Sequence, residues 1–131
     1  MKIYRAMIPA TDGFPQIGQS ARKLGVRVLD QAPNNDVDAG KETDIVKPGK
    51  GMSAVPDDPA NLAKNRRPPQ VNGGIGKDPV WVMDTGDLGP DLQYEQDAPT
   101  HGLVAPARPM TLAEYEAALH AMREKWVRHI G

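Results

Sequence analysis

The glycine and proline content of this chain limits the folds that it can adopt. Thirteen glycines and thirteen prolines occur among 131 residues, and ten of the prolines lie between residues 47 and 109. Both residues disfavour helix interiors, and proline in a sheet is confined to edges, bulges and strand ends. The sequence therefore predicts short strands joined by long connections, and it excludes long regular elements over most of the chain.

The bulk composition indicates one folded domain spanning residues 1–131. Hydrophobic residues make up 39% of the chain and charged residues 25%, which is ordinary for a folded protein of this length. The formal net charge of −1 provides no field that would attract nucleic acid or an anionic membrane, so the chain carries no strong nucleic-acid signal. No apolar run approaches the roughly 20 residues of a membrane span.

The absence of cysteine excludes disulfides and thiolate metal sites. It is compatible with a reducing, cytoplasmic location. The segment "MKIYRAMIPATDG" has no apolar run long enough for a signal peptide. We expect a cytoplasmic protein, and delivery into another cell would need a route that does not read a cleaved signal.

Alternating apolar residues predict several short strands. Residues 2–9 form the first, with Arg5 on the same face as Ile3 and Met7. The ordinary explanation for such an arginine is a packed stem with a solvated head. Further strands are expected at 26–30, 52–55, 80–84 and 101–106. The long connections between them, at 57–78 and 85–100, are of the kind that carries function or is disordered.

Two helices are predicted. Residues 16–25 have the pattern of a short helix that ends at Gly25, with cations in its last turn. Near the C-terminus, Thr111 and Glu114 form a capping-box pattern. Apolar residues then recur at helical spacing, which predicts an amphipathic helix up to Ile130 with its stripe in the core: Leu112, Tyr115, Leu119, Met122, Trp126 and Ile130. The fold class is α+β.

Common site motifs are missing. The three histidines have no metal spacing, and residues 34–45 lack the glycine and glutamate of a calcium loop, so no metal site is predicted. "VNGGIG" lacks the spacing of a phosphate-binding loop and opens no helix, which favours a turn. Arg66 and Arg67 fit a solvated loop better than a grip on RNA or an acidic substrate.

One distributed pattern remains: an arginine in "IYRA" (3–6), a serine in "PGKGMSAVP" (48–56), and the polar cluster "EQDAPTH" before a late strand. Together with "DLGPDLQYEQD" (87–97) and "THGLVAPARPM" (100–110), this order resembles the type VI secretion effector toxin family with an ADP-ribosyltransferase-like fold. The run from Asp87 to Met110 is the most specific part of the resemblance, which spans nearly the whole chain.

The resemblance implies a split β-sheet core, two apposed sheets around a cleft for NAD. It implies a toxin that binds NAD and transfers ADP-ribose, or cleaves NAD, in the cytoplasm of a target cell. The macromolecular target is unknown, and an immunity protein is expected to cover the cleft.

Roles for individual residues follow from the same resemblance. Arg5 would contact a phosphate or ribose oxygen, a task that suits its fork of donors. Ser53 would hydrogen-bond the nicotinamide ribose, and Gly51 beside it would allow close approach of the ligand. Tyr4 or Trp81 would stack on nicotinamide. Ordinary structural roles for Ser53 and Trp81, in a turn and in the core, remain open.

The sequence departs from ADP-ribosyltransferases at the start of the late strand, where those enzymes carry a glutamate. His101 stands there, with Glu95 and Asp97 upstream. A histidine can bind a ribose hydroxyl or act as a base, so either a nearby carboxylate reaches the cleft or the chemistry differs. The alternative is a non-catalytic interaction module that retains the fold, and an RNA-modifying toxin ranks last.

Overall fold

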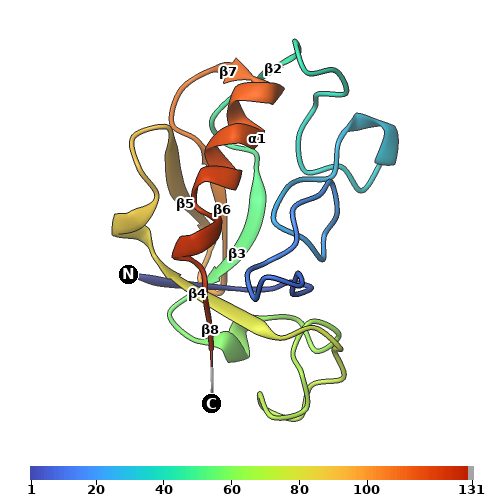
Figure 1. Cartoon of the computed structure of the whole chain (residues 1–131), viewed down its shortest axis with the longest axis vertical. Coiled ribbons are helices and arrows are strands. Elements are labelled where there is room, and N and C mark those ends of the chain that lie inside the picture. The colour runs from blue at the N-terminus through green and yellow to red at the C-terminus, as the bar shows by residue number, and fades with distance from the viewer. Residues whose placement is uncertain (130–131) are drawn as a thin grey trace.

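A six-stranded antiparallel sheet forms the centre of the computed structural model, which describes residues 1–129 (Figure 1). Its strand order is β5-β6-β3-β1-β4-β8. The strands are β1 (Lys2–Ala6), β3 (Met52–Pro56), β4 (Val80–Asp84), β5 (Leu92–Ala98), β6 (His101–Pro106) and β8 (Val127–Arg128). Two short strands, β2 (Ile45–Val46) and β7 (Met110–Thr111), pair separately, and one α-helix, α1 (Leu112–Ala121), completes these elements. The α+β class is confirmed, with a predominance of β-structure.

The middle strands of the central sheet, β1, β3 and β4, are buried on both faces. Ile3 and Met7 belong to the larger core, to which α1 contributes Tyr115 and Leu119. Tyr4 points to the opposite face, into a smaller core shared with residues from the 57–78 connection. Because successive side chains of a strand point to opposite faces, β1 supplies both cores. Within residues 1–129, no helix is long and apolar enough to cross a membrane.

The strand β3 changes its partner midway. Its C-terminal half pairs with β1, through Tyr4 opposite Val55, whereas its first residues pair with β6, through Ser53 opposite Leu103. Beyond Tyr4 the strands β1 and β3 therefore separate, and we call this point the fork. The expected pair of apposed sheets around a cleft is not present: β1 and β3 belong to one six-stranded sheet, which contains the fork.

Two tyrosine hydroxyls form hydrogen bonds with backbone groups of the paired strands β3 and β6. The Tyr115 hydroxyl accepts from the Met52 backbone N–H at 3.0 Å and donates to the Val104 carbonyl, so it bridges β3 and β6. Burial raises the pKa of Tyr115, which keeps its hydroxyl protonated as a donor. The Tyr94 hydroxyl donates to the Ala54 carbonyl at 3.1 Å.

The predicted helix at 16–25 is wrong. Its backbone groups do not form the bonds of a helix: Ile8 N–H donates to Arg22 O at 2.8 Å, and within the segment Leu24 N–H donates to Gln16 O, eight residues earlier, at 2.7 Å. Carbonyl groups of this segment also accept from Arg5. Tertiary hydrogen bonds therefore override a weak helical pattern. Among residues 1–129, the short helical turns outside α1 are of the 3₁₀ type: Leu29–Gln31, Pro59–Asn61, Thr85–Asp87 and Arg123–Lys125.

The remaining element predictions are partly confirmed. Strands are present at 52–56, 80–84 and 101–106, but the predicted strand at 26–30 is absent, because the Arg27 backbone N–H donates to the Asp36 carboxylate at 2.8 Å. The strand β5 was missed within the predicted 85–100 connection. Its exposed polar residues alternate poorly, since it forms one edge of the sheet.

The C-terminal helix is shorter than predicted. The capping box between Thr111 and Glu114 is confirmed, but the helix ends at Ala121 and a short strand, β8, follows. Trp126 is buried from outside the helix, and Ile130 lies outside the described residues. Arg123 donates to the Pro15 carbonyl at 2.7 Å, which holds the chain where the helix stops.

Replacing Tyr115 by phenylalanine tests the bridge between β3 and β6. The change removes one hydroxyl and leaves a buried N–H and a buried carbonyl without their partner, so we expect the free energy of unfolding to fall by about 1–3 kcal/mol. Urea denaturation measures this value. Tyr94→Phe, which loses one partly buried hydrogen bond, is the matched control and should cost about 1 kcal/mol. Equal unfolding midpoints for Tyr115→Phe and the wild type would show that the bridge contributes nothing.

Candidate functional site

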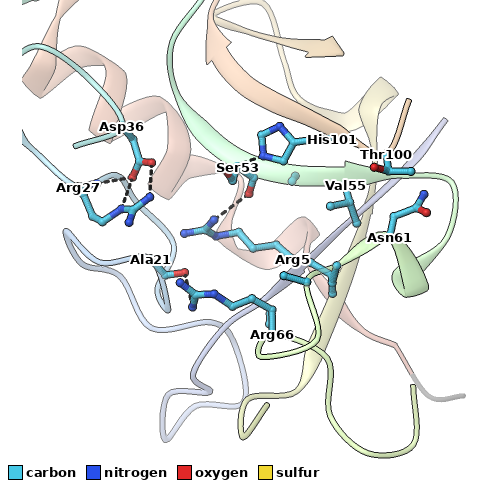
Figure 2. Close-up of a pocket in the computed structure, with 14 residues that line it drawn as sticks. Arg5, Ala21, Arg27, Asp36, Ser53, Val55, Asn61, Arg66, Thr100 and His101 are labelled. Atoms are coloured by element: carbon cyan, nitrogen blue, oxygen red, sulfur yellow. Dashed lines mark hydrogen bonds and ion pairs between the residues drawn. The ribbon is translucent and has the colours of Figure 1, made fainter. Parts of the chain in front are cut away.

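A pocket of about 330 Å³ opens at the fork between β1 and β3 (Figure 2). This volume lies in the range of small-molecule sites, roughly 300–1,000 Å³. Its walls come from the fork, from the segments around residues 21–36 and 61–66, and from the start of β6. The lining residues are Arg5, Ala6, Ala21, Arg27, Asp36, Ser53, Ala54, Val55, Asn61, Leu62, Ala63, Arg66, Thr100 and His101.

A chain of three polar side chains stands at one end of this pocket. Ser53 Oγ lies 3.1 Å from His101 Nε2, and His101 Nδ1 lies 2.7 Å from Asp97 Oδ1. With Nδ1–H donating to the carboxylate, Nε2 is left to accept from the serine hydroxyl. This arrangement orients the imidazole and equips it to take a proton at Nε2.

The local sequence explains how Asp97 reaches His101. Strands β5 and β6 form a hairpin, and its pairing shifts between Gln96 and Ala98. Such a bulge leaves a residue outside the regular pairing and can redirect its side chain. Here Asp97 is that residue, and it bonds His101 on the facing strand, four positions along the chain.

Arg5 binds backbone carbonyl groups on both sides of the fork. Its Nη1 donates to Ser53 O at 2.8 Å (Figure 2). Its Nη2 donates to Lys23 O at 2.8 Å. Longer bonds reach Ser20 O and Gly25 O, each from Nη2. The side chain is only 6% exposed. Burial lowers the pKa of Arg5 to about 10, with Asp36 acting in the opposite direction.

Much of the remaining pocket wall is cationic. Arg27 pairs with Asp36 through two bonds, Nε to Oδ2 at 3.1 Å and Nη2 to Oδ1 at 2.9 Å. The hydrogen bonds to Asp36 raise the pKa of Arg27. Arg66 projects from the 61–67 segment and donates through Nη1 to Ala21 O at 3.3 Å. Three guanidinium groups and one carboxylate therefore line the pocket, which gives it an excess of positive charge.

Two predicted ligand-stacking residues lie in the cores instead of the pocket. Tyr4 is 7% exposed and meets His129 edge to face, with the ring centroids 5.5 Å apart. Trp81 is 1% exposed, and its indole N–H donates to the Met7 carbonyl at 2.9 Å. Neither residue lines the pocket at the fork. Trp81 is therefore a core residue, which is the alternative that the sequence left open.

Two other predicted residues also lie away from the pocket lining. Gly51 packs against the Tyr115 hydroxyl and the β6 backbone, where a Cβ would clash. Glu95 accepts from the Gly49 backbone N–H at 2.9 Å, so it holds the turn that precedes β3. Of the two carboxylates considered, Asp97 is the one that the fold brings to His101.

Several pocket residues gave no signal in the sequence. Arg27 and Asp36 are paired across an irregular segment, and nothing in their spacing marks them. Arg66 was predicted to be solvated, since its position depends on how a long connection folds. Within residues 1–129, no group of three histidine, cysteine or acidic side chains is placed to hold a metal ion.

Comparison with known proteins identifies one family. A family model described as Tse2 ADP-ribosyltransferase toxin matches residues 3–129. That range includes every residue that lines the pocket at the fork. Comparisons with curated proteins and with solved structures gave no match.

Arg5→Lys tests whether the fork depends on a guanidinium. A lysine keeps the charge but loses the planar fork of donors, so at least one buried carbonyl is left unpaired. We expect the free energy of unfolding to fall by about 1–3 kcal/mol for each such carbonyl, measured by urea denaturation.

Arg22→Lys is the matched control for Arg5→Lys. Arg22 pairs with Asp78 through a half-exposed side chain, and surface pairs of this kind are worth less than about 1 kcal/mol. If both variants unfold at the same urea concentration as the wild type, the hydrogen bonds from Arg5 to the backbone carbonyls do not stabilise the fold.

Proposed function

This chain belongs to the Tse2 ADP-ribosyltransferase toxin family of type VI secretion effectors, and on that premise we propose that it binds NAD in the pocket at the fork. We further propose that it transfers ADP-ribose to a macromolecular target, or to water. NAD supplies the bond between nicotinamide and ribose that such a transfer breaks. The observation that carries the proposal is the Ser53–His101–Asp97 chain at the end of a cationic pocket.

The pocket chemistry fits a dinucleotide. Guanidinium groups suit the negative oxygens of a diphosphate, and Arg27 and Arg66 both line the pocket. Hydroxyl and imidazole groups suit ribose hydroxyls, and Ser53 and His101 offer them at the other end. The volume of about 330 Å³ suits part of such a ligand, with the remainder extending from the mouth of the pocket.

His101 is the proposed base. Its Nε2 faces Ser53 and the pocket, while Asp97 fixes the other ring nitrogen. Proton removal from the attacking hydroxyl, amine or water at Nε2 would produce a better nucleophile. Asp36 lines the pocket, but its two oxygens are engaged by Arg27. This favours an imidazole over a free carboxylate as the group that handles the proton.

Ser53 and Arg5 act together in this proposal. The Ser53 hydroxyl would bind a ribose hydroxyl beside the reacting bond, and Arg5 holds the Ser53 backbone through its carbonyl. Arg5 is thus a positioning residue, because most of its donors are engaged by the protein backbone. Asp97 is likewise a positioning residue, acting through His101.

Partner and place of action follow from the family. We propose that an immunity protein binds over the pocket and that the toxin acts in the cytoplasm of a target cell. Members of toxin families of this kind typically pair with such proteins. The open side of the pocket, formed in part by Thr100 and His101, is the surface that such a partner would have to close.

Nicotinamide release from NAD tests the proposed reaction. Purified wild type, Ser53→Ala, His101→Ala and Asp97→Asn are each incubated with NAD and a bacterial lysate as the source of acceptors. Chromatography quantifies the nicotinamide released. We expect His101→Ala to lower the rate by about 100-fold or more, as is usual for loss of a general base. Asp97→Asn should give a smaller loss, because the imidazole remains.

Arg108→Ala is the control for this experiment. Arg108 pairs with Asp91 outside the pocket, so this variant should match the wild type. Parallel induction of each protein in a bacterial host links the chemistry to growth arrest. If the wild type arrests growth but releases no nicotinamide, and His101→Ala arrests growth equally, the interaction-module alternative replaces the enzyme.

A further inference from the structure

The three arginines that face the pocket differ in how many N–H groups remain for a ligand. Arg5 uses Nε, Nη1 and Nη2 on backbone carbonyls. Arg27 uses Nε and Nη2 on Asp36. Arg66 has one bond, from Nη1 to Ala21 O at 3.3 Å, at the long end of the hydrogen-bond range. Since a guanidinium carries five N–H donors, Arg66 keeps the most for a ligand.

The backbone segment that carries Arg66 is held in place by contacts with residues 74–76. Gly76 N–H donates to Arg67 O at 2.7 Å, and Ile75 N–H donates to Lys64 O at 3.0 Å. A Cβ at Gly76 would lie 2.8 Å from the carbonyl carbon of Arg66. Gly74 and Gly76 of "VNGGIG" are therefore occupied by contacts with the protein backbone. They allow residues 74–76 to pack closely against the segment that carries Arg66.

The two ends of the pocket are chemically distinct. In Figure 2, Arg66 lies at the opposite side of the pocket from His101, with Arg5 between them. Ser53 and His101 form the end that suits ribose hydroxyls, and Arg66 forms the end with free cationic donors. A ligand that spans both ends would place its anionic group beside Arg66.

We propose that Arg66 binds the diphosphate of the nucleotide and so fixes the direction in which the nucleotide lies in the pocket. The ribose next to the broken bond is then directed towards Ser53 and His101. This assigns to Arg66 the phosphate contact that the family resemblance gave to Arg5. The identity of the ligand as a dinucleotide rests on the proposed function. The contact between Arg66 and a diphosphate does not require that the bond be broken.

Calorimetric titration with ADP-ribose and with adenosine tests this contact. ADP-ribose carries the diphosphate, and adenosine lacks it. We expect Arg66→Ala to bind ADP-ribose about 10- to 100-fold more weakly than the wild type, as for loss of a hydrogen bond to a charged group. Adenosine binding should be unchanged. Added salt should weaken the binding of ADP-ribose by the wild type more than by Arg66→Ala, because a charge pair has been removed.

Two further variants guard against indirect effects. Arg108→Ala removes the same charge outside the pocket and should bind ADP-ribose like the wild type. Arg66→Gln keeps a shorter polar side chain without the charge, and it should also lose affinity. Urea unfolding of each variant shows whether the fold is retained.

The outcomes separate this inference from the proposed reaction. If ADP-ribose binding depends on Arg66 but NAD releases no nicotinamide, the diphosphate contact stands and the transferase proposal fails. If the wild type releases nicotinamide and folded Arg66→Ala and Arg66→Gln keep the same KM and ADP-ribose affinity, the contact is overturned and the reaction stands. Failure of the wild type to bind ADP-ribose overturns the contact as well.

Discussion

The buried guanidinium of Arg5 joins three parts of this protein that the sequence keeps far apart. It lies on β1, donates to Ser53 O on β3 across the fork, and donates to Lys23 O in the irregular segment that the sequence had predicted as a helix. A buried cation is costly unless its donors are engaged, and here backbone carbonyl groups engage them. The bond to Ser53 O also supplies a partner for a carbonyl that lies where the strands separate. The fork can therefore open a pocket without leaving β3 unsupported.

The arrangement divides structural and chemical roles among residues of similar type. Arg5 donates to backbone carbonyls and Arg27 donates to Asp36. Arg66 has one hydrogen bond within the protein, to Ala21 O, and keeps most of its donors for a ligand. Likewise Tyr115 serves the pairing of β3 with β6. The half-exposed pair formed by His101 and Asp97 stands beside Ser53 at the pocket. The contact with Asp97 thus orients the His101 imidazole at the start of β6.

Sequence patterns predicted the parts of the fold that depend on local rules. Alternation located β1, β3, β4 and β6, and the capping box placed the start of α1. The order of Arg5, Ser53 and His101 along these strands led to the family. The missed features depend on tertiary contacts. The segment 16–25 gives up its helical pattern to bonds with Arg5 and distant backbone groups, and β5 is too polar at its free edge to show alternation. Periodicity also placed Tyr4 on a strand face without revealing that a core covers it, and it gave no hint that residues 74–76 pack against the segment that carries Arg66.

The most direct test of a nucleotide site at the fork is an NMR titration of ¹⁵N-labelled wild-type protein with carba-NAD, an analogue whose nicotinamide–ribose bond resists cleavage. Binding at the fork should shift the backbone amide signals of Ser53, Ala54, Arg66 and His101 together and saturably, and should leave the signals of α1 in place. Saturable shifts confined to another surface, or none at concentrations well above those of cellular NAD, would contradict a nucleotide site between β1 and β3.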